Sequence, residues 1–301
     1  MASKRIDEPT GTETVGHEWD GIEELNTPLP RWWLWTFYLT VVFAIGYVIA
    51  YPAIPLLSHG TEGVIGWTSR GQLDKDTKAA AAAQAGIHQQ IAGLDIQQLA
   101  ANPDLMSQAV SGGRAAFLVN CVQCHGSGAA GSEGYPNLND DDWLWGGSLP
   151  EIEQTLQHGI RQPGDDATRT SQMPAFADIL EPGQVSQVAD YVLSLSGKGQ
   201  ANAAGAQVFA DNCAVCHGAD GKGLRQFGAP DLADAIWLYG GTKAQVVQQV
   251  RHPRHGVMPA WQGRLDPVTI RMLAAYVHSL GGGEDFAEIA DAPAEAADEQ
   301  P

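Results

Sequence analysis

The sequence of 301 residues predicts an all-α protein, in which one N-terminal transmembrane helix is followed by two similar helical domains in tandem. Three observations support this prediction. One long apolar run near the N-terminus carries no charge. The same set of short motifs then occurs twice along the chain, and apolar residues around these motifs recur at helical spacing with no alternating strand pattern.

The apolar run from Trp32 to Tyr51 predicts the membrane span. A helix of this length covers about 30 Å, the thickness of the hydrocarbon core of a bilayer. Aromatic residues at both of its ends suit the two membrane interfaces, and Pro52 ends the helix. The preceding residues 1–31 are acidic, which argues against a cleaved signal peptide. We therefore expect a retained anchor at 32–57.

Two further segments lie outside the repeated part of the chain. Residues 58–105 are expected to form a connector, whose Ala- and Gln-rich part at 68–101 favours a helix. Residues 284–301 combine acidic residues with Ala and Pro, so we expect a disordered acidic tail. The net charge of −18 and the lack of a basic patch exclude nucleic acid as a partner.

Residues 106–198 and 203–283 are two copies of one unit, which we expect to form two domains. The first copy contains VNCVQCHG, WLWGG, MPAF and YVLSL, and the second contains DNCAVCHG, WLYGG, MPAW and YVHSL. The first copy is longer, and its extra residues fall within the polar stretch 161–172. This stretch is expected to be a surface loop.

Each copy is predicted to contain the same helices. One helix leads into the cysteine loop, and a short helix follows, capped by Ser148 in the first copy and by Thr242 in the second. A final helix begins at Pro182 in the first copy and at Pro267 in the second.

The cysteine loops predict two covalently bound haem c groups. A zinc site would leave each copy short of ligands, and a redox disulfide would need a preceding strand. In C-x-x-C-H, the two thiols attach to the haem vinyl groups and the histidine binds the iron. The carbonyls of Pro136 and Pro230 are candidates to hold the other ring nitrogen of each histidine. The predicted haem-binding residues are Cys121, Cys124, His125, Cys213, Cys216 and His217.

Met173 and Met258, each followed by proline, are the predicted sixth ligands of the two irons. Met106 and Met272 lie on apolar helix stripes and are expected to be core residues. The repeat spacing favours a methionine that serves the haem of its own copy. An exchange of methionines between the two domains stays open.

These motifs resemble the class I cytochrome c domain over about 110–197 and 203–281, so the fold is expected to be two tandem cytochrome c-like haem domains behind the anchor. The stretch HEWDGIEELNTPLPRWW at 17–33, followed by one span, resembles the di-haem subunit III, or P subunit, of cbb3-type cytochrome c oxidase.

This resemblance implies an electron-transfer subunit with no catalytic residues of its own. It would pass electrons from a donor cytochrome c toward a mono-haem cytochrome c subunit and a haem–copper catalytic subunit, in a proton-translocating oxidase. The chain would cross the lipid bilayer of a bacterial inner membrane once, with residues 1–31 in the cytoplasm and the haem domains in the periplasm. Two alternatives are a di-haem subunit of another periplasmic redox enzyme and a di-haem peroxidase.

Overall fold

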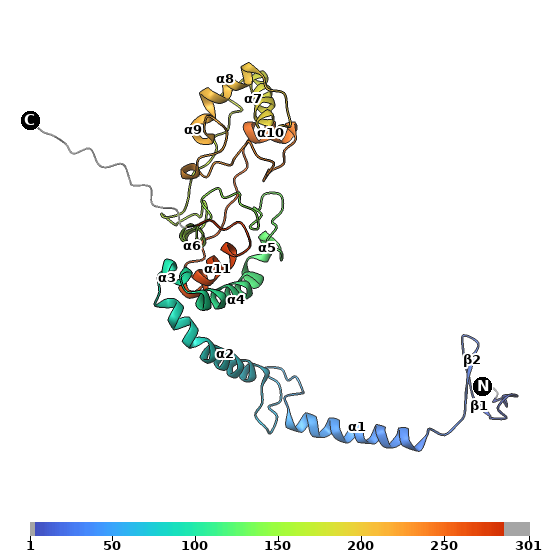
Figure 1. Ribbon diagram of the computed structural model, residues 1–301. Helices are drawn as coiled ribbons and strands as arrows, with labels where there is room; N and C mark the ends of the chain where they lie inside the picture. Colours follow the sequence, from blue (N-terminus) through green and yellow to red (C-terminus); the bar gives the residue numbers. More distant parts are fainter. Residues whose placement is uncertain (1–3, 286–301) are drawn as a thin grey trace, which may run out of the picture. The chain divides into compact units, whose positions relative to one another are not determined.

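The computed structural model describes residues 4–285, which divide into two compact units after Ala83. The first unit contains a β-hairpin and helix α1, and the second contains the repeated part of the chain (Figure 1). Most of the predicted acidic tail, residues 286–301, lies outside the described residues.

A short antiparallel hairpin in the first unit is the exception to the all-α prediction. Strands β1 (Thr14–Trp19) and β2 (Ile22–Leu25) pair with each other. Asp20 and Gly21 join them with φ values of 50° and 83°. Positive φ at both central residues matches the twist of paired strands, and Asp-Gly is a preferred pair for such a turn. The Asp-Gly pair was the available signal for the hairpin, because the flanking strands are too short to show clear alternation.

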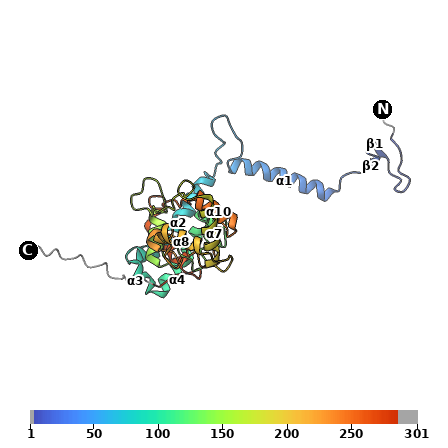
Figure 2. The same cartoon turned by 90° about the horizontal axis from the view of Figure 1, so that it is seen from above.

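Helix α1 (Arg31–Ala50) lies where the membrane span was predicted. It is one unbroken helix in both views (Figures 1 and 2). Within its own unit it buries no residue, and its aromatic and aliphatic side chains are exposed all round. In the described chain it is the one helix long and apolar enough to cross a membrane. A helix of this kind satisfies its backbone hydrogen bonds internally and presents mostly apolar side chains to lipid.

The predicted connector helix is divided into two. Helix α2 (Ser69–Ala92) ends before Gly93, and helix α3 (Ile96–Ala100) starts at a capping box in which Asp95 and Gln98 bond each other's backbone N–H. Ile91 at the end of α2 is buried in the second unit. The connector therefore continues into the core of the second unit.

Each copy of the repeat contains its predicted helices. The first copy has α4 (Pro103–Asn120), α5 (Val122–His125), α6 (Leu149–His158) and α7 (Pro182–Leu195). The second has α8 (Ala203–Asn212), α9 (Ala214–His217), the 3₁₀ turn η1 (Arg225–Phe227), α10 (Lys243–Arg251) and α11 (Pro267–His278). Capping boxes at Ser148 and Thr242 start α6 and α10, as predicted.

The packing of these helices does not follow the two sequence copies. Helix α11, from the end of the second copy, packs on α4 and α6 of the first, and α7 of the first copy packs on α8 and α10 of the second (Figure 1). We call α4, α5, α6 and α11 the first body, and α7, α8, α9 and α10 the second body. The ranges 106–198 and 203–283 are thus repeats in sequence, whereas each packed body takes its closing helix from the other copy.

The same close helix crossing occurs in both bodies. A Cβ on Gly113 of α4 would lie 1.9 Å from the carbonyl oxygen of Met272 on α11. A Cβ on Gly205 of α8 would lie 2.2 Å from the carbonyl oxygen of Gln187 on α7. Gly113 and Gly205 occupy matching positions in the two copies, as do Met272 and Gln187. The exchange of closing helices is therefore reciprocal.

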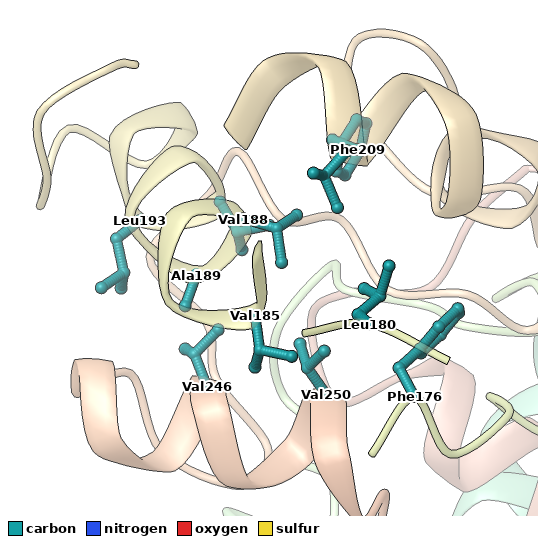
Figure 3. Packing of buried hydrophobic residues seen from close by; sticks show 11 residues of the cluster. Phe176, Leu180, Val185, Val188, Ala189, Leu193, Phe209, Val246 and Val250 are labelled. Atoms are coloured by element: carbon teal, nitrogen blue, oxygen red, sulfur yellow. The ribbon is translucent and has the colours of Figure 1, made fainter. Parts of the chain in front are cut away.

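The core of the second body shows how the exchanged helix is held. Val185, Val188 and Ala189 of α7 are buried, and Val185 and Ala189 face Val250 and Val246 of α10 (Figure 3). This spacing places them on one face of α7, so the face is buried against the helices of the second copy. Phe209 of α8, together with Phe176 and Leu180 that precede α7, completes the cluster (Figure 3).

Candidate haem-binding sites

The first site is a cavity in the first body. Helix α4 ends at Asn120, Cys121 follows it, and the single turn of α5 carries Cys124 and His125. The cavity is lined by Cys121 and His125, and on other sides by Phe117, Leu156 and Met258. The remaining walls are mostly apolar, and they come from α6, α11 and the loop at 136–146. Met258 belongs to the second copy of the repeat.

The second site is a cavity in the second body with matching parts. Cys213, Cys216 and His217 line it, together with Met173 of the first copy. Its volume is about 570 Å³, against about 110 Å³ for the first cavity, because it extends to the loop at 135–137 beside the first site.

Both histidines are held by the predicted backbone carbonyls. His125 Nδ1 lies 3.3 Å from the carbonyl oxygen of Pro136, and His217 Nδ1 lies 3.2 Å from that of Pro230. Burial lowers the pKa of both imidazoles, and these hydrogen bonds oppose the shift. A neutral imidazole whose Nδ1 proton is donated to a carbonyl keeps Nε2 as a metal ligand.

The buried thiol of each cysteine pair is kept protonated. Burial, with a smaller effect of Cys124, raises the pKa of Cys121 to about 11. Burial and Cys216 raise the pKa of Cys213 to about 11 in the same way. The two members of each pair form no disulfide. A thioether forms when a thiol adds across a vinyl group, so paired free cysteines beside a histidine suit haem attachment.

Residues 171–176 and 256–261, which we call the methionine segments, each lie at the cavity whose C-x-x-C-H motif comes from the other copy. The backbone N–H of Trp261, after Met258, donates to the carbonyl of Leu156 at the end of α6 (2.9 Å). The N–H of Phe176, after Met173, donates to the carbonyl of Val250 at the end of α10 (3.1 Å). These are matching positions of the two copies, so each methionine segment is fastened to the short helix of the other copy.

The residues at both cavities fit a haem. Each cavity combines one imidazole, one thioether sulfur and at least one thiol of a C-x-x-C pair with apolar side chains. Cys121 lines the first cavity, and Cys213 and Cys216 line the second. Soft sulfur and imidazole ligands in an apolar setting are the axial ligands of electron-transfer haems. Elsewhere among residues 4–285, no group of three or more His, Cys, Asp or Glu side chains is arranged to hold a metal ion.

The structure also tests the expectations for Met106, Met272 and the stretch 161–172. Met272 is buried with 6% of its surface exposed, and Met106 packs against the core, as predicted. The stretch 161–172 forms a loop of exposed and half-buried residues, as expected, and the guanidinium of Arg161 within it is partly buried. It donates to backbone carbonyls of both methionine segments, an arrangement that requires the crossing and was not visible in the sequence.

Asp142 is a further residue that sequence reasoning did not single out. It lines both cavities. Burial raises its pKa to about 6, with smaller contributions from Asp234, Asp140, Asp231 and Asp141. The run of three aspartates at 140–142 was the available signal, but such runs are usually solvated surface charge.

Three family models match consecutive parts of the chain. Residues 11–58 match the N-terminal domain of cytochrome oxidase-cbb3, FixP. Residues 110–196 match cytochrome c, and residues 200–277 match cytochrome c oxidase, cbb3-type, subunit III.

Curated relatives match over nearly the whole chain. A cbb3-type cytochrome c oxidase subunit FixP from Sinorhizobium medicae is 56% identical, over 93% of this chain and 98% of that protein. A subunit CcoP from Cereibacter sphaeroides is 55% identical, over 92% of this chain and 97% of that protein. A subunit FixP from Bradyrhizobium diazoefficiens is 48% identical, over 93% and 98% respectively.

Proposed function

The chain belongs to the family of cbb3-type cytochrome c oxidase subunits FixP and CcoP, and from this premise we propose that it carries two covalently attached haem c groups with exchanged axial methionines. As a family member it is a membrane-anchored, electron-transfer cytochrome c subunit of an oxidase complex. This membership favours the oxidase subunit over the peroxidase and over a subunit of another redox enzyme.

The proposed ligands follow the two cavities. The first haem is attached to Cys121 and Cys124 and ligated by His125 and Met258. The second haem is attached to Cys213 and Cys216 and ligated by His217 and Met173. The observation that carries the assignment is that each cavity is lined by the histidine and at least one cysteine of the C-x-x-C-H motif of one copy and by the methionine of the other.

When bound, each haem iron supplies one-electron exchange between Fe(III) and Fe(II). The chain's own residues hold the two axial ligands of each haem in place, so that they need not move when the iron changes oxidation state. The Pro136 and Pro230 carbonyls orient the two imidazoles, and backbone bonds fasten both methionine segments. Apolar side chains line much of each cavity. A thioether ligand favours the reduced iron, which raises its reduction potential.

The partners and the orientation in the membrane are part of the proposal. Haem is attached to C-x-x-C-H motifs outside the bacterial inner membrane, so the second unit is periplasmic and the hairpin of the first unit is cytoplasmic. Electrons enter from a donor cytochrome c. They leave toward a mono-haem cytochrome c subunit and the haem–copper catalytic subunit, beside which α1 is anchored in the bilayer.

The experiment uses full-length chains that retain one haem each. A Cys213→Ala/Cys216→Ala chain keeps the first haem, and a Cys121→Ala/Cys124→Ala chain keeps the second. Mass spectrometry of the unaltered chain should show two haem additions that resist acid–acetone extraction.

Methionine substitutions in these two backgrounds then assign the ligands. In the chain with the first haem, Met258→Leu should remove the Fe(III)–thioether charge-transfer band and lower the reduction potential, and Met173→Leu should do neither. The chain with the second haem should respond in the opposite way. The exchange would be refuted if the band were lost on substitution of the methionine that belongs to the same copy as the haem-binding cysteines.

A further inference from the structure

We propose that Arg161 is a positioning residue for both haems, because its guanidinium holds the two methionine segments in place together. This inference rests on the ligand assignment above and adds a residue that lies outside every ligand motif. It concerns how the methionines are kept at the two irons, and it assigns Arg161 no contact with either iron.

The guanidinium donates hydrogen bonds to both segments at once. Arg161 Nε donates to the carbonyl oxygen of Gly256 over 2.6 Å, and a terminal nitrogen donates to that of Ser171 over 2.9 Å. Gly256 lies two residues before Met258, and Ser171 lies two residues before Met173. One rigid planar group therefore joins matching positions of the two segments, whose methionines line different cavities.

The backbone around Arg161 is also held to this place. Its φ is 54°, in the left-handed region that non-glycine residues rarely adopt. Its N–H donates to the carbonyl of Arg169 (2.7 Å), and the preceding Ile160 pairs with Met258 in both directions. An unfavourable conformation of this kind persists where surrounding contacts determine it, and such residues cluster at functional sites.

The charged guanidinium of Arg161 has the carbonyls of Gly256 and Ser171 as its partners. Among the described residues, no Asp or Glu lies within ion-pair distance of it, although seven ion pairs of other Lys and Arg residues are present. Burial lowers the pKa of the guanidinium, yet arginine stays charged in proteins. Hydrogen bonds from a charged, partly desolvated donor are stronger than neutral ones, so two of them can fix two loops.

Arg161 lies in the stretch 161–172, within which the first copy carries its extra residues. Its guanidinium is a single cation that contacts both methionine segments. Loss of this residue should therefore weaken methionine ligation at both haems together.

The test is Arg161→Gln in the full-length, haem-loaded chain. Imidazole, which competes with methionine for Fe(III), is titrated and followed by absorbance. The one-haem backgrounds described above separate the two sites. We expect the apparent affinity for imidazole to rise by about tenfold at both haems, the amount that corresponds to losing about one net hydrogen bond at each segment.

Two further variants separate positioning from charge. Arg161→Lys keeps the charge but loses the planar fork, and it should raise imidazole affinity at both haems, though less than Arg161→Gln. Arg169→Gln removes a similarly buried cation from the same stretch, one that contacts Thr155, Gln154 and the Trp145 ring. It should leave the imidazole affinity of both haems unchanged.

The outcomes are distinct from those for the ligand assignment. An increase at only one haem, or an Arg161→Lys chain that behaves as the unaltered protein does, would overturn the positioning role. The same holds if Arg169→Gln reproduces the effect of Arg161→Gln. Absence of the thioether band in the unaltered chain would instead overturn the proposed ligation itself.

Discussion

Ile160 and Met258 pair in both directions, and each backbone N–H donates to the other's carbonyl over 3.0 Å. This pairing fixes the backbone of Met258 to the end of α6, inside the first body. A ligand fixed through its backbone needs little reorganisation when the iron changes oxidation state. The pairing also requires a close approach of the preceding Gly159, whose φ is 67°.

Gly159→Ala should displace Met258 from the first haem. A Cβ at this position would lie 2.2 Å from the carbonyl oxygen of Met258, and the φ is unfavourable for alanine. We expect the thioether band of the first haem to be lost and the free energy of unfolding to fall by about 2–4 kcal/mol. Absorbance and thermal unfolding measure the two effects.

Gly164→Ala is the matched control, because Gly164 has a φ of 80° and open space around its Cβ position. It should cost only about 1 kcal/mol and keep the band. Equal behaviour of the two variants would show that backbone strain, and not the contact with Met258, decides the effect at Gly159.

The crossing of α4 and α11 offers a second pair of substitutions. Gly113→Ala places a Cβ 1.9 Å from the backbone of Met272, which cannot move without moving α11. We expect about 2–3 kcal/mol of destabilisation in chemical denaturation. Gly112→Ala meets only the flexible end of the Met272 side chain and gains helix propensity, so it should change stability by less than about 1 kcal/mol. The reverse order of the two effects would contradict the observed helix register.

The sequence was sufficient for the local parts of both sites. These parts depend on contacts between residues that are close in sequence. They are the C-x-x-C-H loops, the carbonyls of Pro136 and Pro230, and the helix caps at Ser148 and Thr242. Short-range chemistry of this kind can be inferred from spacing and residue type. The apolar run Trp32–Tyr51 matches α1 to within one residue at each end, whereas the expected anchor bound of 57 lies seven residues beyond the end of the helix.

The exchange of closing helices could not be inferred in this way. The two copies carry similar apolar faces, so α4 can bury itself against α7 or α11 with similar local propensities. The chain between α7 and α8 is short, running from 196 to 202, and short connections favour packing of neighbouring helices against each other. That linker length was the signal for the exchange, and it competed with the stronger expectation that each repeat folds by itself.

Glu284→Ala should weaken the junction between the C-terminal segment and the start of α6. The Glu284 carboxylate accepts a hydrogen bond from the Gly147 N–H (2.8 Å) and pairs with Arg225, and its side chain is 26% exposed. We expect a loss of about 1–2 kcal/mol in thermal unfolding, because the Gly147 N–H loses its partner. Glu133→Ala, which removes a 60% exposed partner of Arg254, should cost less than about 1 kcal/mol. Equal losses would mean that the Gly147 contact contributes nothing.

The reduction potential of the haems should depend on pH through Asp142, which lines both cavities. Its pKa is raised to about 6, so the carboxyl is protonated at pH 5 and ionised at pH 7. A carboxylate near the iron stabilises Fe(III). The potential should therefore fall as the pH rises through about 6, by an amount on the order of tens of millivolts.

Potentiometric titration between pH 5 and pH 8 measures this dependence, and Asp142→Asn should remove it. The Asn variant should show at pH 8 the higher potential that the unaltered chain reaches at pH 5. Asp141→Asn, at the exposed neighbouring position, should retain the slope, with its midpoint moved to slightly lower pH because Asp141 contributes to the raised pKa of Asp142. A slope that persists in the Asp142→Asn chain would assign the coupling to another group.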